Sequence, residues 1–425
     1  MNHQLAAGIL NVFRDDAFCD PAPLRQFPAR EWSRTEFWLD ASGLALYFLN
    51  RLENLHATSC IPPQVLNKLE SKRKGSAKRA AVQLQELESL TNLLQERAIP
   101  FVVMKGFTLI PDYCPDATLR YQLDLDFLVP EIDAQICRHA LRRLRFELTD
   151  HTTEVWQFKR GSSRLPGLPD LYRPQRQSTV ELHFSVRGAY GPEITPYLID
   201  RTVLRSVKGF VIPSLSDVDL FIAQAAHLFG HIRSEWTRAS WLLEFRNFVA
   251  GRRNDEDLWS RVTTAVADRD DLRTAVGCAL EAATRAWGEF APPELTEWFC
   301  RYLNPGVRRW CEDYTPHILH AEFPGTKFYL ILERELGQDT GAWKRLRRAK
   351  LLPLRKPPKV IPQGAAFGKE SASARTLAEL RYVLFRARFH IQQGIRTAWH
   401  LRKWQAKRPS VQVNRCLSES IKVAD

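Results

Sequence analysis

The most constraining feature of this chain is the run Leu-Asp-Leu-Asp-Phe that begins at Leu123. Successive side chains of a β-strand point to opposite faces of its sheet, so Leu123, Leu125 and Phe127 can face a core. Asp124 and Asp126 then share the other face, roughly 6.5 Å apart along the backbone. Aspartate is depleted in strands, so it would be unusual for this pair simply to face water on a half-exposed strand. Two carboxylates at this spacing can bind divalent cations.

A second alternating run, Thr179–Ser185, adds a third carboxylate. Its apolar residues can face the same core, which leaves Glu181 and His183 on the opposite face. If this strand pairs with the first, Glu181 joins Asp124 and Asp126 on one face. The sequence therefore predicts a metal site built from three acids on two strands.

The residues upstream of the first acidic run predict a strand, a turn and a short helix. Phe101–Met104 is an apolar, β-branched run typical of a buried strand. Lys105 and Gly106 end this strand, and the next apolar residues predict a helical turn. Arg120 then precedes the acidic run.

This order of features resembles a known family. The succession of strand, Lys105-Gly106, helix, Arg120, Asp-x-Asp strand, helix and Glu-x-His strand is similar to the uncharacterised nucleotidyltransferase family of the polymerase-β-like superfamily. The motif-bearing resemblance covers Thr91 to Arg187. Most of that superfamily has Gly-Ser where this chain has Lys105-Gly106.

The resemblance implies transfer of a nucleoside monophosphate from an NTP to an acceptor hydroxyl, with release of pyrophosphate. Asp124, Asp126 and Glu181 would be the catalytic residues and would bind two Mg²⁺ ions, with Mn²⁺ as an alternative. Glu181 would also accept the proton of the attacking hydroxyl. ATP is the favoured nucleotide, and the sequence leaves the acceptor open.

Five further residues are expected to bind the nucleotide. Lys105 and Arg120 are candidate phosphate contacts, the first as a point charge and the second as a bidentate fork. Gly106 has no Cβ and lets the backbone approach phosphate oxygens, and Thr108 can add a hydrogen bond. His183 either orients Glu181 or contacts the acceptor.

The chain is expected to be α+β, with a small mixed β-sheet nucleotidyltransferase core flanked by helical regions. We predict an N-terminal helical region at 1–95, the catalytic core at 96–190, a helical domain at 191–340 and a basic tail at 341–425. Apolar spacing predicts helices over 38–55 and 65–97 within the first region. A polar insertion, Gly161–Ser178, has a length typical of a disordered or a functional loop, and in the second case Arg164, Arg173 and Arg176 would be candidate substrate contacts.

Cysteine usage and apolar runs favour a cytoplasmic protein. The eight cysteines lack Cys-x-x-Cys spacing, which argues against a zinc module and a disulfide framework. The first residues lack the features of a signal peptide, and no apolar run reaches the ~20 residues of a membrane helix. His227 and His231 stand one helical turn apart, but no third ligand is evident, so packing is favoured over zinc.

The net charge of +13 is concentrated in the tail. Residues 341–425 hold 20 Lys and Arg against 4 Asp and Glu, so the rest of the chain carries 41 against 44. A basic amphipathic helix is predicted over 376–407, with Leu380, Leu384, Ile391, Ile395 and Trp399 among its apolar positions. Such a helix can contact an anionic membrane surface or another polyanion, or dock on its own protein.

Two alternatives to catalysis therefore stay open. The chain could be an inactive nucleotidyltransferase fold that serves as a binding or scaffold protein, although retention of three neighbouring acids argues against it. It could also bind a membrane surface or polyanion through residues 341–425, peripheral to its cytoplasmic location.

Overall fold

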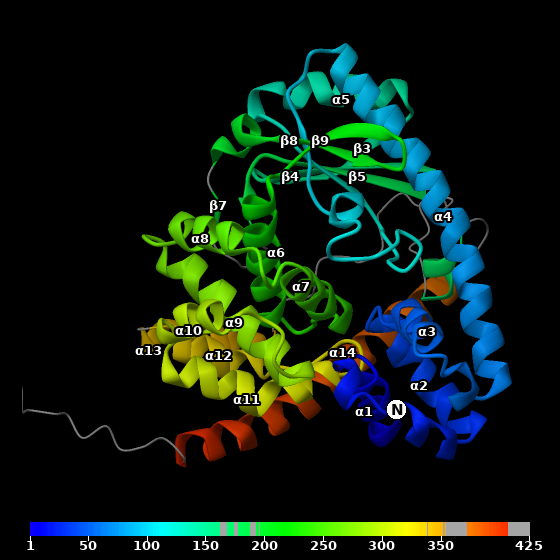
Figure 1. The fold of residues 1–425 in the computed structure, drawn as a ribbon, viewed down its shortest axis with the longest axis vertical. Helices are drawn as coiled ribbons and strands as arrows, with labels where there is room; N and C mark the ends of the chain where they lie inside the picture. Colours follow the sequence, from blue (N-terminus) through cyan, green and yellow to red (C-terminus); the bar gives the residue numbers. More distant parts are fainter. Residues whose placement is uncertain are drawn as a thin grey trace, which may run out of the picture. The chain divides into compact units, whose positions relative to one another are not determined.

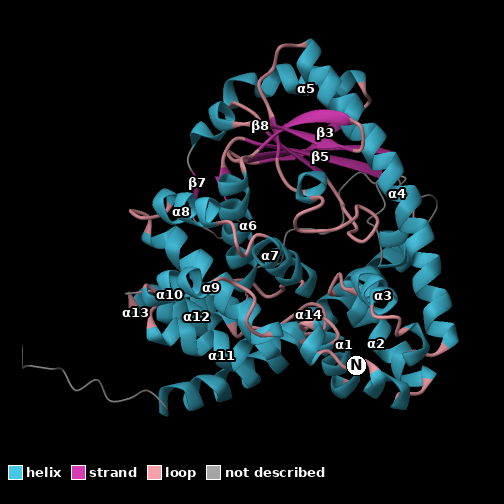
Figure 2. Cartoon of the chain, in the orientation of Figure 1, coloured by secondary structure: helices cyan, strands magenta, loops and turns pink. Residues whose placement is uncertain are grey.

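The computed structural model describes residues 1–161, 168–173, 177–187, 193–194, 196–337, 339–351, 353 and 372–406. They belong to two compact units, one within Met1–Gln338 and one that contains helices α13 (Thr340–Leu351) and α14 (Ala372–Ala406). Helices make up most of the described chain (Figure 2). Arg164 and Arg176 of the predicted insertion lie outside the described residues, as does the linker from 354 to 371.

A seven-stranded mixed sheet forms the centre of the first unit and confirms the predicted α+β class. Parallel pairing joins β2 to β5 and β1 to β9, and the other neighbours are antiparallel. In their order across the sheet the strands are β3 (Glu147–His151), β4 (Val155–Gly161), β5 (Gln177–His183), β2 (Leu125–Leu128), β1 (Val102–Val103), β9 (Phe210–Ser214) and β8 (Val203–Val207). A separate pair consists of β6 (Val186–Arg187) and β7 (Glu193–Ile194).

The hairpin of β8 and β9 lies in a region for which the sequence analysis expects helices alone. Lys208 and Gly209 form its turn with φ values of 47° and 102°. A two-residue hairpin turn of this type needs positive φ at both positions, because its twist then matches that of the strands. The sheet therefore extends beyond the predicted core of 96–190.

Alternating side chains on the central strands fill the core, as predicted. Leu125 and Phe127 of β2 and Val180 and Leu182 of β5 are all buried in one cluster. Helices α4 (Pro63–Glu96) and α5 (Ala134–Arg143) add Leu87, Leu90, Leu94, Cys137 and Leu141 to the same cluster. Figure 1 shows α5 on one side of the sheet and α6 and α7 on the other. The acidic residues of β2 and β5 point away from this core.

The N-terminal region is helical, as predicted, but the first of its two predicted helices is broken. The expected helix over 38–55 consists of α2 (Ala29–Ala41) and α3 (Ala45–Asn54), with α1 (His3–Asn11) before them. Gly43 lies between α2 and α3 with φ +77°, a conformation that ends a helix and suits glycine. A Cβ on Gly43 would lie 2.4 Å from the hydroxyl oxygen of Ser240, so this turn is packed directly against α7.

Among the described residues of the first unit, seven helices follow the sheet. They are α6 (Asp217–Ile232), α7 (Ala239–Gly251), α8 (Glu256–Ala265), α9 (Asp270–Trp287), α10 (Pro293–Arg301), α11 (Pro305–Leu319) and α12 (Tyr329–Leu336). Ser216 caps α6, since its hydroxyl accepts a hydrogen bond from the amide of Asp219. The two helices that matter for the site are α6 and α7.

Helix α14 is the basic amphipathic helix expected over 376–407. Several of its apolar side chains are exposed, namely Leu380, Leu384, Ile391, Ile395 and Trp399. Within the described residues, no helix is long and apolar enough to cross a membrane.

Candidate active site

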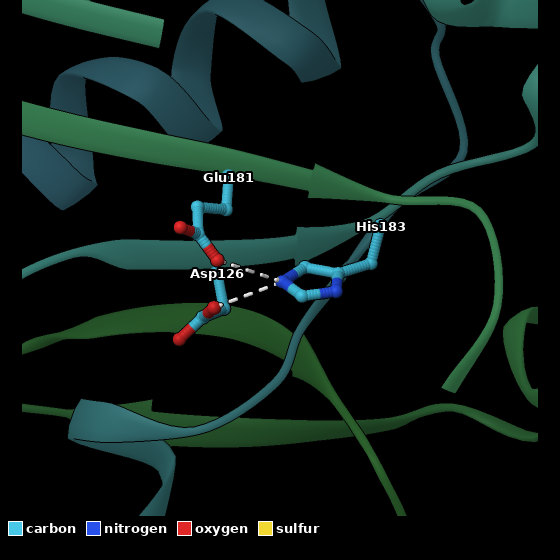
Figure 3. Close-up of side chains that lie close together, drawn as sticks. All are labelled: Asp126, Glu181 and His183. Carbon is cyan, nitrogen blue, oxygen red and sulfur yellow. Dashed lines mark hydrogen bonds and ion pairs between the residues drawn. The ribbon is translucent and has the colours of Figure 1, made fainter. Parts of the chain in front are cut away.

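Asp126, Glu181 and His183 come together on the face of the sheet opposite the core (Figure 3). The parallel register of β2 and β5 places Asp126 opposite Glu181 and Leu128 opposite His183. The Nε2 atom of His183 is 2.9 Å from Oδ1 of Asp126 and 3.5 Å from Oε2 of Glu181. One ligand atom from each residue lies within 4.8 Å of the others. Strand pairing thus brings two of the three predicted acids to one point.

Positive groups stabilise the charge on this buried pair. Asp126 is only 5% exposed, and burial alone would raise its pKa. Lys105, with Nζ 3.6 Å from Oδ1, and His183 outweigh burial and hold the pKa of Asp126 below its ordinary value. Burial likewise opposes the charge on Glu181, but hydrogen bonds from His183 and Gln157 lower its pKa. In return, these carboxylates raise the pKa of His183 against the effect of burial.

Asp124 lies just before β2, outside the three-residue cluster. Burial, then the negative charges of Asp126 and Glu181, raise the pKa of Asp124 to about 7. Side chains from helix α4 hold the preceding loop. The carbonyl of Gln122 accepts hydrogen bonds from Nε of Arg79 (3.1 Å) and the amide of Gln83 (3.0 Å). The three acids therefore interact through their charges, although Asp124 lies outside strand β2.

The turn after β1 is a 3₁₀-helix, η4 (Gly106–Leu109), packed close to these acids. Asp126, Asp124 and Glu181 raise the pKa of Lys105 against the effect of burial, so Lys105 stays charged. Gly106 has φ +70°, and a Cβ there would lie 2.2 Å from Nε2 of Gln122. The hydroxyl of the buried Thr108 donates to the carbonyl of Met104 at 3.0 Å. Gly106 and Thr108 thus have structural roles in the turn, and their contact with phosphate stays a prediction.

The comparison with protein families agrees with this geometry. The model of the family described as "Uncharacterised nucleotidyltransferase" matches residues 28–288, which is more than half of the chain. The chain belongs to this uncharacterised nucleotidyltransferase family. No curated protein matches it, and no solved structure does. The match includes the helices on both sides of the predicted core, so the family unit comprises α2 to α9.

Arg120 is paired with a residue that the sequence analysis did not connect to it. Its Nε lies 3.2 Å from Oε1 of Glu244 on α7, and the hydroxyl of Tyr47 donates to the same carboxylate at 2.8 Å. Glu244 is buried, and its charge raises the pKa of Arg120 against the effect of burial. Arg120 therefore serves to join the loop before β2 to α7, and its predicted contact with phosphate stays untested by the geometry.

Helix α6 (Asp217–Ile232) carries two histidines, of which His227 lies within electrostatic range of Asp126 and Lys105. Burial, then the charge of Lys105, lowers the pKa of His227 well below its ordinary value, whereas Asp126 acts in the opposite direction. The ring centroid of His231 is 4.5 Å from that of His227 and 4.1 Å from that of Trp241 on α7. Burial, then Arg238 and Lys105, lowers the pKa of His231 to about 4. Both rings are therefore uncharged at neutral pH.

The donor atoms of the cluster fit a divalent cation. Mg²⁺ prefers carboxylate oxygens, at about 2.0–2.1 Å, so two atoms that share one ion lie at most roughly 4.2 Å apart. Asp126, Glu181 and His183 offer donor atoms within 4.8 Å of one another, which small side-chain rotations bring into range. Asp126 is buried and Glu181 is half-buried, and both are charged, which favours a cation between them.

Proposed function

We propose that this protein transfers a nucleoside monophosphate from an NTP to an acceptor hydroxyl, in a reaction that depends on Mg²⁺. Membership of the family supports nucleotidyl transfer as the general chemistry. The observation that carries the proposal is the alignment of Asp126 with Glu181 on parallel strands, with Lys105 3.6 Å from Asp126. Phosphoryl transfer needs charge neutralisation and alignment more than covalent chemistry, and this arrangement can supply both.

In this proposal Asp124, Asp126 and Glu181 bind the cations. Mg²⁺ held there would neutralise phosphate charge and lower the pKa of the attacking hydroxyl. Because Asp124 has a pKa of about 7 without a cation, it must give up its proton to become a ligand. His183 orients the carboxylates of Asp126 and Glu181 through its Nε2 atom. Lys105, released from Asp126 by the cation, can turn toward a phosphate oxygen.

A thermal stabilisation experiment tests the proposal. The four NTPs are added separately to the full-length protein, with and without Mg²⁺, and the unfolding midpoint is measured. A ligand at roughly 100 times its Kd adds about 2.7 kcal/mol of stability. We expect one NTP, with ATP the first candidate, to raise the midpoint only with Mg²⁺, and Asp126→Asn and Glu181→Gln to remove this effect. Glu147→Gln on the exposed end of β3 is the matched control and should respond as wild type.

If no NTP stabilises the wild-type protein with Mg²⁺, the proposal is wrong. If one does, the same nucleotide with a label at its α-phosphate is used to screen acceptor hydroxyls. Label that stays on the nucleotide with every acceptor class would favour the inactive scaffold over the enzyme.

The exposed apolar residues of α14 support a second candidate function, contact with an anionic membrane surface. Trp399, Ile391 and Ile395 are more than half exposed, on a helix rich in arginine. Helices of this composition lie in membrane interfaces. Co-sedimentation with vesicles that contain phosphatidylserine should be lost when Ile391, Ile395 and Trp399 are replaced by serine, and retention of binding would exclude this face.

A further inference from the structure

Arg238 directly precedes α7, and its guanidinium stacks on two aromatic rings. Its guanidinium lies 4.6 Å from the ring centroid of Tyr121 and 4.9 Å from that of Trp241. Within the described residues, it has no carboxylate within 4.0 Å and its side chain makes no hydrogen bond. A guanidinium that stacks on rings through its faces keeps the N–H groups at its edge available. Arg238 is partly exposed, so these groups can reach a ligand.

The other arginines near the acids are already engaged. Arg120 is paired with Glu244, and Arg79 donates to the carbonyl oxygens of Gln122 and Asp170. Neither arginine can move away from its partner without leaving a buried polar group unsatisfied, which costs free energy. A cation binds a ligand with the smallest loss of free energy when it has no existing ion pair or hydrogen bond to break. Arg238 meets this condition.

A chain of ring contacts connects Arg238 to the acidic cluster. Trp241 contacts the rings of His227 and His231, with centroid distances of 5.3 and 4.1 Å. The charges of Lys105 and Asp126 in turn affect the pKa of His227, the first lowering it and the second raising it. Tyr121, the other ring under Arg238, lies three positions before Asp124. Arg238 and Lys105 both lower the pKa of His231, so one histidine of α6 lies within electrostatic range of both cations.

Two carboxylates, Asp40 and Glu244, act on the same Tyr121 ring as Arg238, but each already has a cationic partner, Lys72 and Arg120 respectively. The neighbouring histidines are neutral at pH 7, so they neither repel nor neutralise an anion. The positive charge of Lys105 interacts with the carboxylates of Asp126, Asp124 and Glu181. A ligand with several negative charges that spans the two positions would pair with both cations at once.

We propose that Arg238 binds the polyphosphate chain of the nucleotide, beyond the phosphate at which the acids act. This inference rests on the proposed function, because it names a contact to the substrate of the same site. The planar guanidinium is preorganised by Tyr121 and Trp241 and can bind two phosphate oxygens side by side. Lysine at this position would keep the charge but lose the paired geometry.

Calorimetric titration of inorganic tripolyphosphate and of ATP, both with Mg²⁺, tests the inference in the full-length protein. We expect Arg238→Ala to weaken the binding of both ligands by roughly 10- to 100-fold, the range of a lost charge-assisted contact. The affinities of Arg238→Lys should lie between those of Arg238→Ala and wild type. Adenosine, which has no phosphate, should bind both variants as it binds wild type. The control is Arg273→Ala, which removes an arginine stacked on Tyr302, the residue after α10, and should bind as wild type.

Mn²⁺ binding, followed by electron paramagnetic resonance, separates this inference from the proposed function. Unchanged Mn²⁺ binding in both Arg238 variants, with weakened tripolyphosphate, supports the inference. Wild-type tripolyphosphate and ATP binding in Arg238→Ala overturns it and leaves the proposed function standing. If only the KM for an anionic acceptor rises, Arg238 serves the acceptor and the inference is also overturned. A wild-type protein that binds neither Mn²⁺ nor ATP overturns both.

Discussion

Asp126 and Glu181 are direct partners in the parallel register of β2 and β5. Alternate side chains of both strands are buried in the core. A shift of either strand by one residue would move its apolar side chains out of the core, to the face that carries the acids. Core packing therefore fixes the separation of the two carboxylates before any ligand binds. This preorganisation is what a cation site requires.

Replacement of either carboxylate by its amide is expected to abolish tight binding of a divalent cation. If both residues bind the same ion, the double variant Asp126→Asn/Glu181→Gln should lose no more affinity than either single variant. Mn²⁺ binding measured by electron paramagnetic resonance gives the three affinities, with Glu147→Gln as the control. Losses that add in the double variant would place the two side chains at separate cation sites.

The strand periodicity in the sequence was sufficient to predict the central part of this site. Alternation placed Leu125 and Phe127 in the core and Asp126 on the opposite face, and the structure confirms it. The same alternation placed Asp124 beside Asp126, but β2 begins at Leu125. Strand ends depend on tertiary packing, which local periodicity does not encode.

Contacts between distant segments could not be predicted in this way. Arg120 and Glu244 are 124 positions apart, and nothing local in either segment indicates the other. The hairpin turn at Lys208 and Gly209 is a different case, since Gly209 and the flanking alternation are a local strand signal. Arg238 also had a local signal, because a cation beside Trp241 on a helix start suggests ring stacking.

Replacement of Gly106 by alanine is expected to destabilise the fold and displace Gln122. The new Cβ would lie 2.2 Å from Nε2 of Gln122, in a backbone conformation with φ +70°. Gly209→Ala is the matched control, because it has φ +102° but nothing within 4 Å of the new Cβ. We expect a loss of about 1 kcal/mol for Gly209→Ala and about 2–3 kcal/mol for Gly106→Ala, measured by urea unfolding. Equal losses would mean that Gln122 moves aside freely.

Replacement of Glu244 by glutamine is expected to cost about 3 kcal/mol or more in unfolding free energy, because it leaves the charge of Arg120 buried without a partner. The pair variant Arg120→Leu/Glu244→Leu should be less destabilised than the sum of the two single leucine variants. Glu297→Gln breaks the exposed pair with Arg301 and should change stability by about 0.5 kcal/mol at most. Additive losses at Arg120 and Glu244 would contradict the coupling.

The neutral state of His231 predicts how stability depends on pH. Its pKa is about 4 in the folded protein and near 6.5 when exposed, so the unfolded chain binds the extra proton between these values. Stability should therefore be complete above pH 6.5 and fall as the pH decreases toward 4. His231→Gln should lessen that fall by on the order of 2 kcal/mol, measured from urea unfolding at pH 7 and pH 4.5. The exposed His139→Gln is the control and should follow wild type. An unchanged pH dependence in His231→Gln would show that the pKa of His231 is the same in the folded and unfolded states and that Arg238 does not oppose its protonation.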